Sequence, residues 1–356
     1  MKMSFRWFGR DNDPIPLEYI RQIPGTEEVV WALHHKKPGE IWTKDEIDEE
    51  VNYIASLGLK SSVVESVNIH DDIKLGLDSR EEYIANYITT LENLAAAGVK
   101  VVCYNFMPVF DWTRTELFHP LEDGSTAMYM EKQQIIDTDP HELIAMFEKG
   151  SKGLTLPGWE PERMAKIKEL FAAYDGITGE ELRANFKYFI DAIIPTCEKH
   201  DIKMAIHPDD PPFEIFNLPR LVNNQKNIDL LLDVNDSPHH GLTFCTGSLG
   251  ANPENNQIEM LEKYVDRTHF IHIRNVDLDE EGNFTEVSHR TADGTVDVVN
   301  LVKVLIENDF NGYIRPDHGR NVFGEDEDSV RPGYGLYDRA MGIMYLNGAI
   351  DAFNTK

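Results

Sequence analysis

The sequence predicts one α/β domain, a closed (β/α)8 barrel spanning residues 1–356. Two observations favour this fold over two separate domains. Strand-like and helix-like segments alternate through most of the chain, which is typical of parallel-sheet architecture, and eight strand-like segments can be counted. No segment between them has the composition of a linker. The hydrophobic fraction of 41% is sufficient for a large core, although length alone would permit one domain or two.

The first four strands are expected from short apolar runs, and the helices between them from capping signals. Thr43 followed three residues later by Glu46 is a capping-box pattern, and a glycine at position 58 is a typical stop. Ser79, Glu82 and a glycine at position 98 repeat that pattern around the next helix. The strands are expected at residues 5–8, 28–33, 61–65 and 99–105.

The alternation breaks over residues 107–177, a stretch too long for an ordinary connection. We interpret it as a helical insertion after strand four, with one helical pattern near residues 160–173. Connections at that end of a strand lie at the mouth of a barrel, so the insertion is expected to act as a lid. A surface excursion unrelated to the site is the alternative.

The second half of the chain resumes the alternation. Thr178 and Glu181 form another capping-box pattern, at the start of a helix that should run to about residue 200. A last helix is expected to close on the barrel. The strands are expected at residues 203–208, 242–247, 269–273 and 313–317, and the further helices at residues 219–232, 255–266, 295–309 and 337–353.

Four consecutive strands each end in a residue that can bind a metal ion, namely His207, Cys245, His272 and Asp317. A lone histidine in an apolar strand is more often a hydrogen-bonded core residue, and a lone cysteine a small apolar one. The carboxyl ends of barrel strands meet at one face, however, so all four should converge. This ligand set suits Zn²⁺, Fe²⁺ or Mn²⁺. A structural zinc site is disfavoured, because its ligands normally come from short spacings.

Polar residues beside these ligands are candidates for substrate chemistry. Arg274 could clamp a carboxylate or form a salt bridge at the rim. His318 could transfer protons or orient Asp317. Tyr334, in a glycine-rich loop, could be brought over the site or only pack the tail against the barrel. Weaker candidates at strand ends, or next to the ligands, are Arg6, Trp7, His34, Asn105, Asn275 and Arg320.

Charge and composition exclude several classes of function. A formal net charge of −28 argues against nucleic acids and anionic membranes as partners. No segment approaches the roughly 20 apolar residues of a membrane span, and the first ten residues do not resemble an export signal. The three cysteines are widely spaced, which favours a reducing compartment over a disulfide framework. We therefore expect a cytoplasmic protein that acts on a small molecule.

Several of these segments together resemble the mannonate dehydratase family of sugar-acid lyases, in the xylose-isomerase-like barrel superfamily. The Cys-Thr-Gly-Ser and Arg-Pro-Asp-His-Gly motifs are specific in combination. The resemblance runs essentially from end to end, and it is carried by residues 3–9, 218–224, 241–248, 270–275, 315–319 and 331–339.

This resemblance implies dehydration of D-mannonate to 2-dehydro-3-deoxy-D-gluconate, a step of hexuronate (glucuronate) degradation, with Mn²⁺ or Fe²⁺ as the metal and Zn²⁺ as a substitute in vitro. Such a reaction removes the proton at C2 and expels the C3 hydroxyl as water. We assign the two proton transfers to Tyr334 and His318 without deciding which residue is the base. Arg274 and Asn275 would orient the substrate.

Two other functions stay open at this point. A sugar isomerase or epimerase could use the same barrel, although isomerase sites are usually rich in carboxylates, and here a cysteine replaces one. A non-catalytic sugar-acid-binding metalloprotein is the other. A metal-dependent phosphodiesterase acting on DNA is disfavoured by the charge of −28. We also expect a homo-oligomer, a dimer or larger, with the C-terminal helix as a possible contact. The choice between mannonate and its C2 epimer gluconate stays open.

Overall fold

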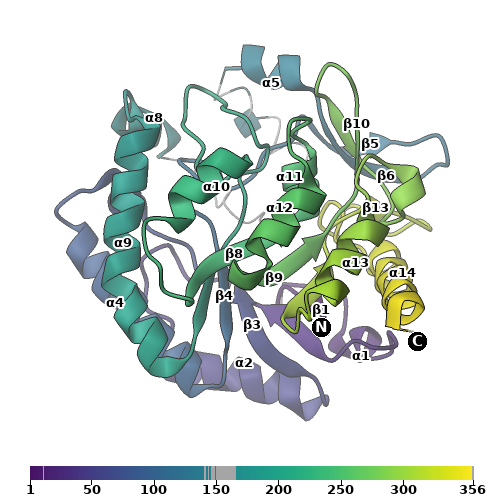
Figure 1. The fold of residues 1–356 in the computed structure, drawn as a ribbon, viewed down its shortest axis with the longest axis horizontal. Coiled ribbons are helices and arrows are strands. Elements are labelled where there is room, and N and C mark those ends of the chain that lie inside the picture. Colours follow the sequence, from purple (N-terminus) through teal and green to yellow (C-terminus); the bar gives the residue numbers. More distant parts are fainter. Residues whose placement is uncertain (11, 140–141, 143, 146–148, 150–165, 355–356) are drawn as a thin grey trace.

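Eight parallel strands close into a barrel in the computed structural model, which describes residues 1–10, 12–139, 142, 144–145, 149 and 166–354 (Figure 1). Neighbours in the barrel follow the order of the chain, and the first strand closes the ring by pairing with the last, with Lys2 opposite Tyr313. This confirms the predicted fold class. The strands are β1 (Lys2–Arg6), β2 (Glu28–Trp31), β3 (Lys60–Glu65), β4 (Val101–Tyr104), β7 (Lys203–Ile206), β8 (His240–Cys245), β9 (Thr268–Ile273) and β12 (Tyr313–Pro316).

Helices surround this barrel, and two of the predicted caps are present. The backbone N–H groups of Thr43 and Thr178 donate to the carboxylates of Glu46 and Glu181, at 3.2 and 2.9 Å. Ser79 differs from the prediction, because its hydroxyl donates to an aspartate of the preceding helix instead of capping its own. The helices are α1 (Leu17–Ile20), α2 (Lys44–Ser56), α3 (Asp71–Leu75), α4 (Arg80–Ala96), α5 (Lys132–Asp137), α8 (Ile167–Tyr174), α9 (Gly179–His200), α10 (Gln225–Leu232), α11 (Thr246–Gly250), α12 (Gln257–Tyr264), α13 (Val298–Glu307) and α14 (Leu336–Asn354), with short 3₁₀ turns at Val265–Arg267 and Thr291–Asp293.

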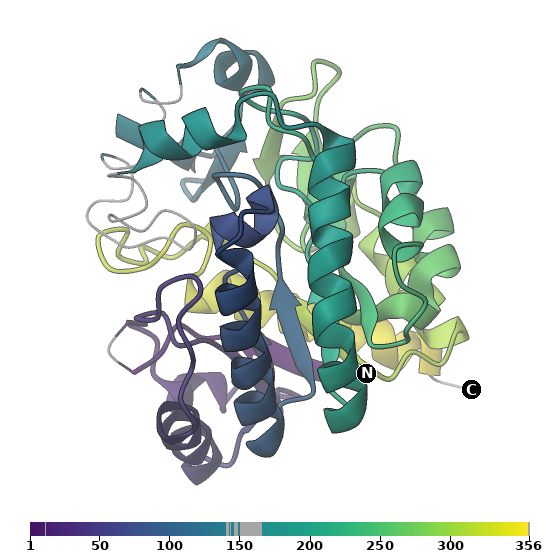
Figure 2. The ribbon, with the colours of Figure 1, turned by 90° about the vertical axis from the view of Figure 1, so that its left-hand side faces the viewer.

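A small antiparallel sheet lies at one end of the barrel, the end to which the strands point. Its central strand, Thr126–Met130, pairs along one edge with Glu116–Pro120. Along its other edge it pairs with two short strands from later connections, Phe284–Glu286 and Arg320–Asn321. The strands are β5 (Glu116–Pro120), β6 (Thr126–Met130), β10 (Val276–Leu278), β11 (Phe284–Glu286) and β13 (Arg320–Asn321). They come from the connections that follow β4, β9 and β12. In Figure 2, α4 and α9 stand side by side along the barrel.

The insertion predicted over residues 107–177 is therefore only partly helical. Its first part forms the hairpin of β5 and β6, and β6 pairs with β11 and β13. The prediction of a helical insertion did not include these strands. Its described helices are α5 and α8. Of the helical pattern at residues 160–173, the part before residue 166 lies outside the described residues.

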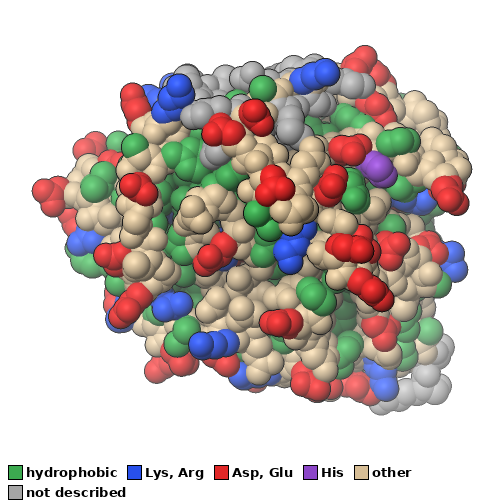
Figure 3. Space-filling view, turned by 90° about the horizontal axis from the view of Figure 1, so that it is seen from above, with side chains coloured by type: hydrophobic (Ala, Val, Ile, Leu, Met, Phe, Trp, Pro, Cys, Tyr) green, Lys and Arg blue, Asp and Glu red, His purple; other side chains and the backbone are tan. Residues whose placement is uncertain are grey.

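Side chains fill the interior of the barrel, so it is a packed core and not a pore. A second, larger apolar cluster packs the strands against the helices. No helix among the described residues is long and apolar enough to cross a membrane. Acidic side chains are scattered over the face seen from above in Figure 3 and do not gather in one patch. The interior cluster is Val30, Val63, Val101, Cys103, Ala205, Phe270 and Tyr313.

Candidate metal centre

The geometry of the strands brings the four predicted ligands together. Successive side chains of a strand alternate between its two faces, so a residue two positions beyond an interior residue also points inward. Ala205 and Phe270 belong to the interior cluster, and His207 and His272 lie two positions further along their strands. The predicted ligands therefore lie on top of the packed barrel core, at the end where the helices begin.

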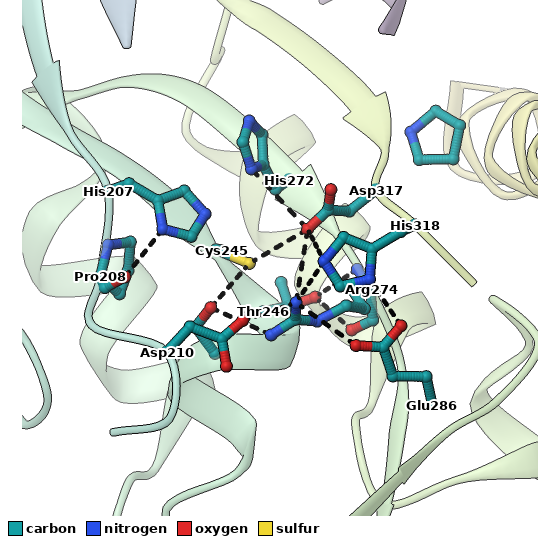
Figure 4. A network of polar contacts seen from close by, with 12 residues as sticks. His207, Pro208, Asp210, Cys245, Thr246, His272, Arg274, Glu286, Asp317 and His318 are labelled. Atoms are coloured by element: carbon teal, nitrogen blue, oxygen red, sulfur yellow. Dashed lines mark hydrogen bonds and ion pairs between the residues drawn. The ribbon is translucent and has the colours of Figure 1, made fainter. Parts of the chain in front are cut away.

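The ligand atoms of His207, Cys245, His272 and Asp317 all lie within 4.8 Å of one another (Figure 4). Cys245 Sγ is 3.6 Å from Asp317 Oδ2, and His272 Nδ1 is 3.9 Å from the same oxygen. Cys245 and His272 are fully buried. Two neutral imidazoles and two anions from four separate strands fit a divalent ion, whose charge the thiolate and carboxylate would balance.

The surroundings favour the metal-binding forms of Cys245 and Asp317, whereas they favour a protonated His207 until an ion displaces its proton. Burial opposes ionisation of the Cys245 thiol, but the charge of Arg274, together with the charge and hydrogen bond of His207, holds the pKa of that thiol well below its ordinary value. Burial likewise opposes protonation of His207, yet the negative charge of Cys245 raises its pKa to about 9. The pKa of Asp317 is well below its ordinary value, because Arg315 outweighs the effect of burial. Without an ion, the proton on His207 therefore lies among these donors.

Two glycines allow other side chains to approach the ligands. A Cβ at position 247, in the Cys-Thr-Gly-Ser motif, would overlap the Arg274 side chain, so only glycine permits that arginine to lie beside Cys245. Gly333 has φ of +72°, and a Cβ there would lie 2.9 Å from the Cβ of His318. This turn places the ring of Tyr334 at 5.2 Å from the ring of His318.

A cavity open at its mouth lies over the ligand group. Of the predicted site residues, Arg6, Asn105, His207, Asp317, His318 and Tyr334 line it. Residues that line it without having been predicted include Phe8, Glu65, Trp112, Met128, Asp210 and Arg315.

Several predicted substrate contacts do not line this cavity. The indole of Trp7 donates to a backbone carbonyl, and His34 bonds Arg6 at 3.1 Å. The amide of Asn275 is buried and holds backbone groups of residues 290 and 296. Arg320 pairs with Asp338 at the edge of the small sheet.

Arg274 lies beside the ligands but has no exposed surface. Its guanidinium donates to Asp210 at 2.9 Å, to Ser248 at 3.0 Å and to Nε2 of His318 at 2.7 Å. The guanidinium that was predicted to clamp a substrate carboxylate is therefore hydrogen-bonded to protein side chains in this structure. Sequence reasoning missed its partner Asp210, and also Arg114 and Glu286, which continue the network. Only the position of Asp210, three residues after a ligand, could have suggested it.

Comparisons with known proteins show which family this chain resembles along its length. The family model described as D-mannonate dehydratase matches residues 1–356. The mannonate dehydratase of Bacillus subtilis (strain 168) is 53% identical over 353 residues, covering 99% of this chain and 97% of that protein. That of Geobacillus thermodenitrificans (strain NG80-2) is 51% identical over 358 residues, covering 100% and 96%.

Solved structures show the same relationship. The crystal structure of mannonate dehydratase from Streptococcus suis serotype 2 superposes with a TM-score of 0.89 at 41% identity, covering 99% of this chain and 95% of that one. A xylose isomerase domain protein from Planctomyces limnophilus has a TM-score of 0.57 at 12% identity, which shows the shared barrel fold alone.

Proposed function

This chain belongs to the mannonate dehydratase family and is a hydro-lyase that dehydrates D-mannonate, and we propose that the reaction takes place in the cavity over the four metal ligands. The observation that carries this location is the juxtaposition of four donors, three of them buried and all within 4.8 Å of one another, with His318 and Tyr334 in the cavity that His207 and Asp317 also line. Loss of water across C2 and C3 gives an enol, which becomes 2-dehydro-3-deoxy-D-gluconate.

We propose Mn²⁺ or Fe²⁺ as the ion held by His207, Cys245, His272 and Asp317, with Zn²⁺ as a substitute in vitro. Four donors leave positions free in a five- or six-coordinate ion, and the thiolate is a ligand for the softer divalent metals. When bound, the ion supplies Lewis acidity toward oxygen atoms of the sugar acid. One ion is favoured over two, because Glu65 is paired with Arg315 at 3.2 Å and faces Arg6 at 3.9 Å.

The proton transfers fall to His318 and Tyr334, and the hydrogen bonds support a choice between them. A guanidinium can only donate, so Arg274 requires Nε2 of His318 to be an unprotonated acceptor. We assign to this nitrogen the removal of the C2 proton, with Arg274 giving way when substrate enters. Burial raises the pKa of Tyr334 above its ordinary value, so its phenol is protonated and can donate to the departing C3 hydroxyl. The proton then passes from His318 back to the phenolate, and the site is reset.

Deuterium exchange tests this assignment. D-mannonate is incubated in D₂O with metal-loaded Tyr334→Phe or His318→Asn protein. We expect both variants to lose turnover by roughly 10²-fold or more, as is typical for removal of a general acid or base. The Tyr334→Phe variant should still exchange the C2 hydrogen, whereas His318→Asn should not. Tyr313→Phe, at the opposite pole of the barrel, is the matched control and should retain activity. Near-normal turnover of both variants would show the assignment to be wrong.

The apolar face between α1 and α14 supports association with a second copy of the chain. Tyr19, Tyr337 and Met344 are 53%, 48% and 48% exposed there. Between residues 336 and 350 the only charged side chains are Asp338 and Arg339, and both are buried. In a chain with a net charge of −28, an uncharged face is where two copies meet with least repulsion. We propose a homodimer through this face.

The cytoplasm remains the proposed location. All three cysteines are free and buried, and Cys245 must stay a thiolate to bind the ion. A reducing compartment would preserve that state.

A further inference from the structure

A closed ring of hydrogen bonds passes through His318 and leads away from the metal ligands. Nδ1 of His318 lies 2.5 Å from Oε2 of Glu286, and Arg114 donates to the other oxygen of that carboxylate at 2.8 Å. Arg114 also donates to both oxygens of Asp210, at 2.7 and 2.9 Å. Asp210 accepts a hydrogen bond from Arg274, and Arg274 also donates to Nε2 of His318, which closes the ring (Figure 4). Arg114, Glu286 and Arg274 have at most 1% exposed surface.

The small antiparallel sheet sets the distance between Glu286 and His318. Glu286 is the last residue of β11, and His318 comes two residues before β13. Both strands pair with β6, where residue 285 lies opposite Tyr129 and residue 320 opposite Ala127. The two side chains therefore approach each other from neighbouring stretches of one edge of a common strand. Arg114 enters just before β5, on the other edge of β6.

The donors and acceptors of the ring admit one tautomer of His318. Arg274 must donate to Nε2, so the ring hydrogen is on Nδ1 and points to Glu286. The Glu286 carboxylate can only accept, which agrees with this arrangement. Arg114 supplies the opposite charge that allows Glu286 and Asp210 to stay ionised although both are buried, since unpaired buried carboxylates would take up protons.

We propose that Glu286 is a positioning residue for the dehydration, which with Arg114 keeps His318 in one tautomer and one orientation, with Nε2 unprotonated and able to receive a proton once Arg274 gives way. The small sheet would then serve to build this support and not only to cover the mouth of the barrel. This inference rests on the proposed role of His318, and it adds a function for residues that touch neither substrate nor metal ligand.

Substituting Glu286 with glutamine tests the proposal with little change of shape. Arg114 donates two N–H groups to Oε1 of Glu286 and would hold the amide oxygen of the glutamine in that place. The amide N–H₂ would then face Nδ1 of His318 and donate to it. Nε2 would have to carry the hydrogen, opposite the N–H of Arg274, so the tautomer that serves as a base is lost.

The experiment is a double-mutant cycle on the metal-loaded enzyme. Glu286→Gln, His318→Asn and the double variant are assayed for kcat and KM with D-mannonate, alongside metal content and the midpoint of unfolding. We expect Glu286→Gln to lower kcat by roughly 10²-fold or more, the range for general acid or base catalysis, with KM and metal content near wild type. The double variant should be no slower than His318→Asn alone, because Glu286 acts only through His318. Glu28→Gln, a buried carboxylate at the start of β2 that bonds Ser62, is the matched control and should keep wild-type kcat.

The outcomes distinguish a failure of the proposed role of His318 from a failure of the proposed role of Glu286. Near-normal turnover of His318→Asn would overturn the proposed role of His318 itself. A slow His318→Asn combined with a normal Glu286→Gln, or with losses that multiply in the double variant, would overturn the positioning role alone. If Glu286→Gln does not fold, Glu286→Asp decides, because it keeps the charge that Arg114 needs and draws the carboxylate back by one methylene. An unchanged kcat in that variant would contradict the proposal.

Discussion

Two buried histidines at the pole opposite the metal ligands predict how the stability of the fold depends on pH. His240 begins β8 and has no exposed surface, and His269 in β9 is 5% exposed. Burial lowers the pKa of His240 to about 4 and, together with the charge of Lys203, that of His269 to about 3. Nε2 of His240 donates to the backbone carbonyl of Leu231 at 3.1 Å, which holds the neutral ring in place.

The sign and size of the effect follow from these pKa values. In the unfolded chain a histidine has a pKa of about 6.5, so between about pH 6.5 and pH 4 the unfolded state binds a proton that the native state refuses. Stability contributed by the neutral ring is therefore complete above pH 6.5 and is lost as the pH falls toward 4. At 1.36 kcal/mol per pH unit, the loss for His240 between pH 6.5 and 5 is about 2 kcal/mol. His269 should contribute a similar amount over the same range.

Substitution of His240 by glutamine removes the titration and keeps an N–H that can reach the carbonyl of Leu231. As the pH falls from 7.5 to 5, the free energy of unfolding of wild type should decrease by about 2 kcal/mol more than that of His240→Gln. Above pH 7.5 the two proteins should give parallel curves, because the imidazole is neutral in both states. Urea unfolding at a series of pH values, in the presence of a chelator, measures the difference and removes the contribution of metal binding. Curves that stay parallel down to pH 5 would refute a neutral, buried His240.

The other predictions concern the metal and the surface. Cys245→Ala should lose both bound metal and activity, and full metal content in that variant would contradict thiolate ligation. Because the pKa of His207 is about 9 in the metal-free protein, ion binding should release its proton, and affinity measured by calorimetry should rise up to tenfold per pH unit below pH 9; an affinity independent of pH would rule this out. Met344→Glu should convert the proposed dimer to a monomer in light-scattering measurements, whereas Leu230→Glu, on an exposed residue of α10, should not; an unchanged dimer in Met344→Glu would place the contact elsewhere.

The barrel could be predicted from the sequence because its signals are local. A short apolar run indicates a strand, and a threonine with a glutamate three residues later indicates a helix start, as at Thr43 and Thr178. The boundaries of single elements were less certain. The first strand was expected at residues 5–8 and is formed by residues 2–6, because its pairing with β2 and β12 sets its length.

The small sheet could not be predicted, because its strands are defined by partners distant in the sequence. β11 has three residues and β13 has two, and neither run is long enough to show an alternating pattern. Their pairing with β6 joins segments more than 150 residues apart. For the same reason, the contacts of Arg114 and Glu286 with the site could not be predicted. Each looks like an ordinary surface charge in the sequence, and only the sheet brings them under His318.

The candidate ligands could be predicted because the rule that places them is topological: every parallel strand of a barrel delivers its last residues to the same face. The hydrogen bonds of the side chains beside these ligands could not be predicted, since they depend on partners from other parts of the chain. Arg274 illustrates the difference. Its position beside His272 follows from the strand, but its engagement with Asp210, Ser248 and His318 depends on three other connections.

The charges around the ligands give a reason why ion and substrate should bind together. Among the described residues that contact one another in this network, five acidic groups face four arginines, which leaves one negative charge. The proton on His207 balances it in the metal-free protein. A divalent ion that displaces this proton leaves one positive charge, and a single substrate carboxylate restores neutrality. The acidic groups are Glu65, Asp210, Cys245, Glu286 and Asp317, and the arginines are Arg6, Arg114, Arg274 and Arg315.

This balance predicts that a sugar acid binds more tightly to the metal-loaded than to the metal-free protein, and by linkage that it raises the affinity for the ion by the same factor. A neutral analogue in which an amide replaces the carboxylate should show a weaker coupling. Calorimetric titration of the acid and the amide, each with and without Mn²⁺, measures both factors. Equal coupling for the two ligands would show that direct ligation by hydroxyl groups, and not the charge of the buried network, decides how the substrate is held.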